Sequence, residues 1–157
     1  MWWLIAHNPT IPMNASTKWM SRAHALIPLT EQEGQVRDLL LEQRLTHLTH
    51  AVFPNGGRLI VVDFFLSDRR TVLECWKTTG RRGVALGWME RNAAFIDVKF
   101  RRLKGLNPGI RCVALAEAPC VEVAILARVL GEVLVHADGL AFSIDGLGSI
   151  IKAGGAS

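Results

Sequence analysis

Two acidic residues stand inside apolar runs of this sequence, where a carboxylate without a partner is costly to bury. Asp63 lies within Leu59–Leu66, and Glu74 lies eleven positions later within Thr71–Trp76. Transfer of an ionised carboxylate into an apolar interior is strongly unfavourable unless it is paired. Two such acids in adjoining runs therefore indicate either a shared metal ion or a satisfied polar pair, and they are candidates for a functional site.

The two apolar runs predict a β-hairpin. A polar segment, Ser67–Arg70, joins them, and short apolar runs bounded by polar turn residues are typical of buried strands. Both strands of a hairpin can direct a side chain to the same face of a sheet, so the carboxylates of Asp63 and Glu74 can converge.

A helix is predicted just upstream, over Glu31–Leu45. Thr30 and Glu33 have the spacing of a capping box, and an apolar stripe that includes Val36 and Leu40 follows at helical spacing. Glu33 falls in the first turn of this helix. Two interpretations stay open for Glu33, a helix cap or a third acid of the site.

The remaining elements are predicted from periodicity and from turn residues. They are an irregular arm at 1–28, an edge strand at 46–53 with a turn at 54–57, a helix at 81–104, a strand at 110–116, a helix at 119–135, and a strand at 140–144 followed by a turn or helix. Strands that alternate with helices are typical of layered α/β proteins. We therefore expect one α/β domain over residues 1–157, with a mixed sheet, the hairpin at its centre, and helices flanking it.

The acids and their order resemble a known family. An acid at the start of the first helix, Asp63 within a long strand and Glu74 on its hairpin partner are similar to the PD-(D/E)xK nuclease superfamily, which has the restriction-endonuclease-like fold. The size, the basic charge and the order of elements look most like small archaeal Holliday-junction resolvases. The resemblance covers roughly residues 30 to 116 and rests on a short motif.

The resemblance implies a metal-dependent DNA endonuclease. Asp63, Glu74 and the backbone carbonyl of Cys75 would present oxygen ligands to Mg²⁺ (or Mn²⁺), and Glu33 would be an outer ligand or would orient water. The family also carries a lysine two residues after the second acid. Here that position is Trp76, and Lys77 comes one residue late.

Three possibilities stay open for the lysine. A bulge can turn Lys77 toward the acids, and Lys77 is the first choice because the strand ends there. Lys99 or Arg91 on the following helix can take the role instead. A protein without the lysine would be a nuclease with impaired chemistry, or a catalytically silent nucleic-acid-binding protein of the same fold.

The charge pattern favours a polyanionic partner. The chain has a formal net charge of +4, and arginines stand on both sides of the acidic residues in the sequence. We expect contacts with DNA phosphates from Arg58, Arg69, Arg70, Arg81 and Arg82. In a competing interpretation, Arg58, Arg81 or Arg82 pairs with Asp63 and Glu74 in a structural ion network.

Other residues give weaker indications. The cysteines, Cys75, Cys112 and Cys120, are far apart and read as reduced thiols, which favours a cytoplasmic protein. No apolar stretch predicts a membrane span. His47 and His50 would face opposite sides of a strand, so we expect surface or DNA-facing residues rather than metal ligands.

The resemblance, together with the basic charge, therefore implies a Mg²⁺-dependent endodeoxyribonuclease that hydrolyses phosphodiester bonds in structured or duplex DNA. Cutting both strands of such a substrate needs two sites, so a homodimer is expected.

Overall fold

The computed structural model describes residues 29–77, 85–117 and 123–154. Its elements follow in the order α2 (Glu31–Glu42), β1 (Leu48–Asn55), β2 (Arg58–Leu66), the 3₁₀ turn η1 (Ser67–Arg69), β3 (Thr71–Lys77), α3 (Ala85–Leu106), β4 (Arg111–Glu117), α4 (Val123–Val133), β5 (Gly139–Ala141) and α5 (Ile144–Gly154). The predicted irregular arm at 1–28 lies outside the described residues, as do Arg81 and Arg82.

The five strands form one mixed sheet in the order β1-β2-β3-β4-β5. The pairs β1–β2 and β2–β3 are antiparallel, and the pairs β3–β4 and β4–β5 are parallel. Helix α3 connects β3 to β4 and helix α4 connects β4 to β5, as parallel neighbours require. The predicted α/β class with a mixed sheet is thus confirmed, and the β2–β3 hairpin includes the middle strand.

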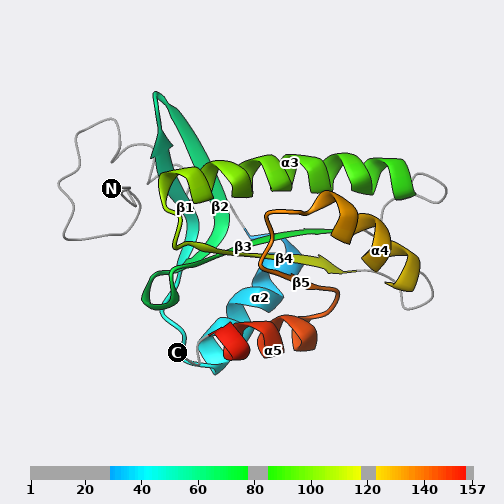
Figure 1. Cartoon of the computed structure of the whole chain (residues 1–157). Helices are drawn as coiled ribbons and strands as arrows, with labels where there is room; N and C mark the ends of the chain where they lie inside the picture. The colour runs from blue at the N-terminus through cyan, green and yellow to red at the C-terminus, as the bar shows by residue number, and fades with distance from the viewer. Residues whose placement is uncertain (1–28, 78–84, 118–122, 155–157) are drawn as a thin grey trace.

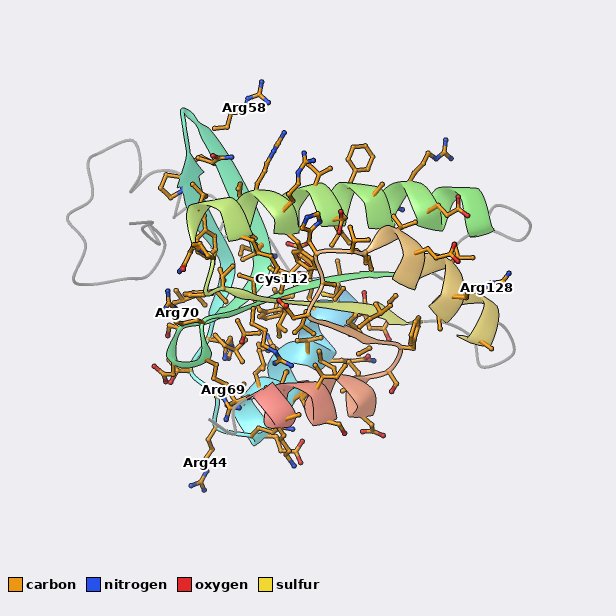
Figure 2. The ribbon with its side chains drawn as sticks, in the orientation of Figure 1. Arg44, Arg58, Arg69, Arg70, Cys112 and Arg128 are labelled. Carbon is orange, nitrogen blue, oxygen red and sulfur yellow. The ribbon has the colours of Figure 1, made fainter. Side chains whose placement is uncertain are left out.

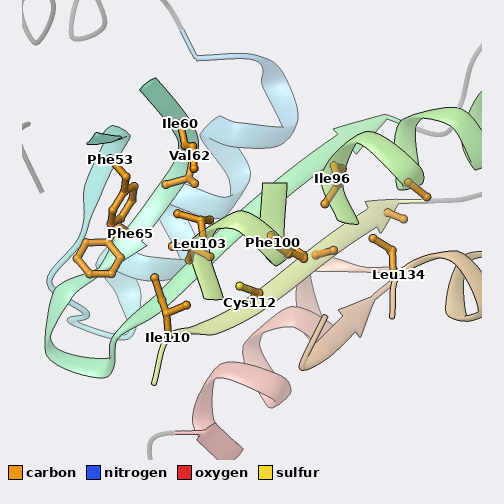
Figure 3. Close-up of a cluster of buried hydrophobic side chains, with 14 of the residues drawn as sticks. Phe53, Ile60, Val62, Phe65, Ile96, Phe100, Leu103, Ile110, Cys112 and Leu134 are labelled. Carbon is orange, nitrogen blue, oxygen red and sulfur yellow. The ribbon is translucent and has the colours of Figure 1, made fainter. Parts of the chain in front are cut away.

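Helices cover both faces of the sheet (Figure 1). Helices α3 and α4 lie over one face, where Ile96 and Phe100 of α3 pack on strand residues such as Val62 (Figure 3). Helices α2 and α5 lie over the other face, where Val36 and Leu147 belong to a second core cluster. The sheet is therefore the middle of three layers, and its central strands are buried on both faces.

The predicted helix cap at Thr30 is confirmed, because the backbone N–H of Glu33 donates to Thr30 Oγ1 at 3.2 Å. The predicted end at Leu45 is wrong, and α2 ends at Glu42. Arg44 takes a left-handed backbone conformation with φ of 54°, and the N–H of Leu45 bonds back to the carbonyl of Leu40. This closing pattern satisfies the last carbonyls and stops the helix early.

Several other predicted boundaries differ from the structure by a few residues, and two of them concern turns. The turn predicted over 54–57 is only Gly56-Gly57, both with positive φ, because Pro54 and Asn55 pair with β2 on the sheet edge, where proline is tolerated. The strand predicted over 140–144 ends at Ala141. Ser143 Oγ accepts from the Gly146 N–H and starts α5 instead.

Among the described residues, no helix has both the length and the apolar character needed to span a membrane.

Two phenylalanines on α3 test this layering. Phe100 is fully buried, so Phe100→Ala should lower the free energy of unfolding by about 3–5 kcal/mol. Phe95 is exposed on the same helix, so Phe95→Ala should change it by no more than about 0.5 kcal/mol. Urea denaturation of both variants measures the difference, and equal losses would contradict the assigned helix orientation.

Candidate active site

The site forms where strands β2 and β3 separate. Their paired residues run from Leu66 and Thr71 to Phe64 and Leu73, and the next pair in this register would be Asp63 and Glu74. That pair is absent from the ladder. Beyond it β2 continues toward the β1–β2 turn, while β3 continues along the sheet beneath α3 (Figure 1).

The two acids replace the missing ladder bonds. The N–H of Cys75 donates to Asp63 Oδ2 at 2.8 Å, and the N–H of Asp63 donates to Glu74 Oε1 at 3.3 Å. Each carboxylate therefore bonds to the backbone of the other strand. Because carboxylates take the place of backbone carbonyls, the strands can separate without leaving these two amides unpaired.

The side-chain alternation of β2 also changes at Asp63. Val62 packs in the core cluster on the α3 side, whereas Phe64 packs on the side of α2 and α5. Residues two apart on a regular strand share a face. The neighbouring strand changes at the same level, because His50, which stands opposite Asp63 in the β1–β2 register, has a left-handed φ of 49°.

Glu33, His50 and Asp63 form a compact group from three elements, α2, β1 and β2. One ligand atom from each lies within 4.8 Å of the others, so the group could hold a metal ion. His50 Nε2 and Glu33 Oε2 are 3.1 Å apart, and both side chains are mostly buried. The helix cap and the acid of the site are thus compatible roles for Glu33, since its backbone serves the cap and its carboxylate faces His50.

The placement of His50 differs from the surface position expected from the sequence. A left-handed backbone costs a residue other than glycine about 1–3 kcal/mol, and strain of this kind is concentrated at functional sites. Regular strand alternation in the sequence does not predict the left-handed backbone of His50. His47, in contrast, bonds to the carbonyl of Leu45 at 2.9 Å and contacts the ring of Phe64 edge-on.

Glu74 reaches toward the opposite helical layer. Lys99 Nζ of α3 lies 3.0 Å from Glu74 Oε1, with the Glu74 side chain 7% exposed and the Lys99 side chain 31% exposed. Lys99, one of the residues considered for the lysine role, therefore contacts the carboxylate of Glu74. Arg91 is on the outer face of the same helix.

The position of Lys77 is described only by its backbone. Lys77 pairs with Glu117, at the end of a ladder between β3 and β4 that runs residue by residue from Thr71 without a bulge. Its side chain lies outside the described residues, so its role stays a prediction. The role of the Cys75 carbonyl as a metal ligand also stays a prediction, while its N–H serves Asp63.

Burial controls the protonation of both acids. It raises the pKa of Glu74 to about 8, with the Asp63 charge adding to the rise and Lys99 opposing it. Burial also raises the pKa of Asp63, a rise that the Cys75 N–H opposes and the Glu33 charge increases. The pKa of the Cys75 thiol is raised for the same reason, so Cys75 stays a neutral thiol. A bound cation would favour ionisation of the acids, so its binding is coupled to proton release.

Of the arginines predicted to contact DNA, the three within the described residues do not gather around the acids. Arg69 donates to the carbonyl of Ile151 at 3.0 Å, and Arg70 donates to Asn107 Oδ1 at 2.9 Å. Both arginines belong to the η1 turn region. From the rise per residue of a β-strand, this region is about 13 Å along the hairpin from the two acids. Arg58 projects from the tip of the β1–β2 hairpin (Figure 2), and Lys99 pairs with Glu74. The alternative pairing of the acids with Arg81 or Arg82 lies outside the described residues.

No protein-family model matches this chain, and no curated protein sequence matches it. The geometry of the site is therefore the basis for assigning its function.

The raised pKa values of the two acids predict that the free energy of unfolding falls as pH rises, the reverse of the usual effect of a paired acid. Between about pH 4.5 and 8 the folded protein holds a proton on Glu74 that the unfolded chain has lost, so the free energy of unfolding falls as pH rises. Asp63 contributes in the same direction. Glu74→Gln cannot ionise, so its melting temperature should depend less on pH over this window. An equally steep fall in Glu74→Gln and wild type would contradict the assignment.

Proposed function

We propose that this protein is a divalent-metal-dependent nuclease that hydrolyses phosphodiester bonds in structured or duplex DNA. One observation carries the proposal: at the separation of β2 and β3, Asp63 and Glu74 are bonded to each other's strands, with an amine on Glu74 and a metal-capable group that shares Asp63. Two acids, an amine and a further acid from the first helix are the groups that the PD-(D/E)xK resemblance implies.

Each residue of the site has a distinct role in this proposal. Glu33, His50 and Asp63 would hold the ion. When bound, a divalent ion stabilises negative charge on the phosphate and lowers the pKa of water. Lys99 holds a positive charge between Glu74 and solvent, where it can stabilise charge on a phosphate oxygen. Once ionised, above its pKa of about 8, Glu74 can accept a proton from an attacking water.

The donor set also bears on which ion binds. Mg²⁺ prefers oxygen ligands and keeps much of its water, whereas imidazole nitrogen suits transition metals. Since His50 supplies a nitrogen beside Glu33 and Asp63, we propose that Mn²⁺ binds this group more tightly than Mg²⁺. Both ions remain candidates to support cleavage.

Calorimetric titration of the isolated protein tests the ion. Mn²⁺ should bind more tightly than Mg²⁺, and His50→Ala should reduce Mn²⁺ affinity roughly 10-fold or more while affecting Mg²⁺ less. His47→Ala is the matched control, because His47 bonds to a backbone carbonyl instead. Equal Mn²⁺ affinity in His50→Ala and wild type would contradict the ligand assignment.

Cleavage of supercoiled plasmid and of a four-way DNA junction, with Mn²⁺, Mg²⁺ or chelator, tests the activity. Asp63→Ala and Glu74→Ala should each reduce cleavage roughly 100-fold or more. Lys99→Met should reduce it strongly, and Lys104→Met on the other edge of α3, where Lys104 pairs with Asp138, is the control. A greater loss in Lys77→Met than in Lys99→Met would move the amine role to the strand.

The same assays separate the two classes of protein. Salt-sensitive DNA binding without cleavage under any metal condition would identify a catalytically silent nucleic-acid-binding protein. Cleavage that persists in Asp63→Ala and Glu74→Ala would show that the chemistry lies elsewhere. A homodimer, proposed because duplex DNA has two strands to cut, is measured by sedimentation with and without DNA.

A further inference from the structure

The outer face of α3 carries a large apolar side chain that the core does not use. Phe95 is 75% exposed, more than the other large exposed hydrophobic residues of the described chain, Leu41 and Val135. Single exposed apolar residues are common and need no explanation alone. Phe95 differs because of what stands beside it on the helix.

Arginines flank Phe95 along one stripe. At 100° per residue, Arg91, Val98 and Arg102 lie within about 60° of Phe95 around the helix axis, and Ala94 lies at the margin of the stripe, about 100° from Phe95. All five residues face solvent to some degree, and none is acidic. The stripe from Arg91 to Arg102 is about 16 Å long, which matches about five stacked nucleotides at 3.4 Å each.

The stripe lies next to the acids. Lys99 stands one turn after Phe95, on the edge of α3 where it contacts Glu74. Asn92 stands on this same edge two turns before Lys99, and its buried Nδ2 has no hydrogen-bond partner among the described residues. A buried donor left unpaired is unfavourable, and a bound ligand that offers an acceptor oxygen would satisfy it.

The charge pattern favours one occupant over another. A second copy packed on this stripe around a two-fold axis would bring arginines against arginines, with no acid on the stripe to compensate. A nucleic-acid strand offers phosphates to Arg91 and Arg102, a ring to Phe95, and acceptor oxygens to Asn92. Stacking on an aromatic ring requires a base that is free of its own neighbours.

We propose that this α3 stripe binds a nucleic-acid strand that carries an unstacked base, and that Phe95 stacks on that base. The inference rests on the proposed function in that it places the substrate of the Asp63 and Glu74 centre. It narrows the substrate from DNA in general to DNA with unpaired nucleotides, such as a junction, a flap or a single strand.

Binding measured by fluorescence anisotropy in chelator, where metal-dependent cleavage does not occur, tests the stripe. The probes are a labelled single-stranded oligonucleotide, a four-way junction and a fully paired duplex. Phe95→Ala and Phe95→Leu should weaken binding of the single strand and of the junction roughly 5- to 100-fold. Phe95→Trp keeps a stacking ring, so it should bind both probes as the wild type does. Leu41→Ala on α2, an exposed apolar truncation in the other layer, is the matched control.

Variants of Arg91, Arg102 and Asn92 test the same binding site independently of Phe95. Arg91→Ala and Arg102→Ala should each reduce the salt dependence of binding by about one phosphate contact. Asn92→Leu removes the unpaired donor, so it should bind single strands more weakly while its melting temperature stays equal or rises.

Several results would contradict the proposal that the α3 stripe binds an unstacked base. Phe95→Leu that binds single strands as tightly as wild type would exclude stacking. Equal losses on the paired duplex and the single strand would exclude selection of an unstacked base. A change of oligomeric state in Phe95→Ala, measured by sedimentation, would identify a second copy as the occupant. If cleavage depends on Asp63 while Phe95 variants bind normally, the proposed function stands and only the stripe fails.

Discussion

The exchange of backbone bonds between Asp63 and Glu74 is the interaction on which the rest of the site depends. Each carboxylate accepts an N–H from the opposite strand, at the level where the β2–β3 ladder stops. Unpaired amides there would make separation of the strands costly, so the acids make the separation possible. The same exchange buries the acids, and burial raises both of their pKa values.

The separation links the two helical layers through the sheet. Asp63 belongs to a group with Glu33 of α2 and His50 of β1, whereas Glu74 is paired with Lys99 of α3. A metal-capable group on one side and an amine on the other therefore meet at the gap between two strands. In this arrangement the ion would be held from the α2 side, and a substrate would approach from the α3 side.

The sequence predicted those parts of the structure that local rules determine. The cap at Thr30, the β2–β3 hairpin and the buried face of α3 follow from residue type and period. The choice of Asp63 and Glu74 as unusual acids also came from their apolar neighbours. These features need no information about distant segments.

The partners of the acids could not be predicted in the same way. Lys99 is twenty-five residues from Glu74, and only the packing of α3 on the sheet brings its amine to the carboxylate. His50 was assigned to the surface because regular alternation was assumed, and its left-handed backbone breaks that alternation. Arg69 and Arg70, predicted to contact DNA, donate hydrogen bonds to the carbonyl of Ile151 in α5 and to Asn107, and their place in a polar turn gives no sign of these partners.

The proposed metal centre at the strand separation consists of Glu33, His50 and Asp63. Anomalous diffraction from crystals soaked in Mn²⁺ tests it most directly, at the absorption edge of manganese. We expect a peak bounded by Glu33, His50 and Asp63, which disappears in crystals of Asp63→Ala. Manganese found only at surface carboxylates, with Glu33 still bonded to His50 and no peak among the three side chains, would contradict it.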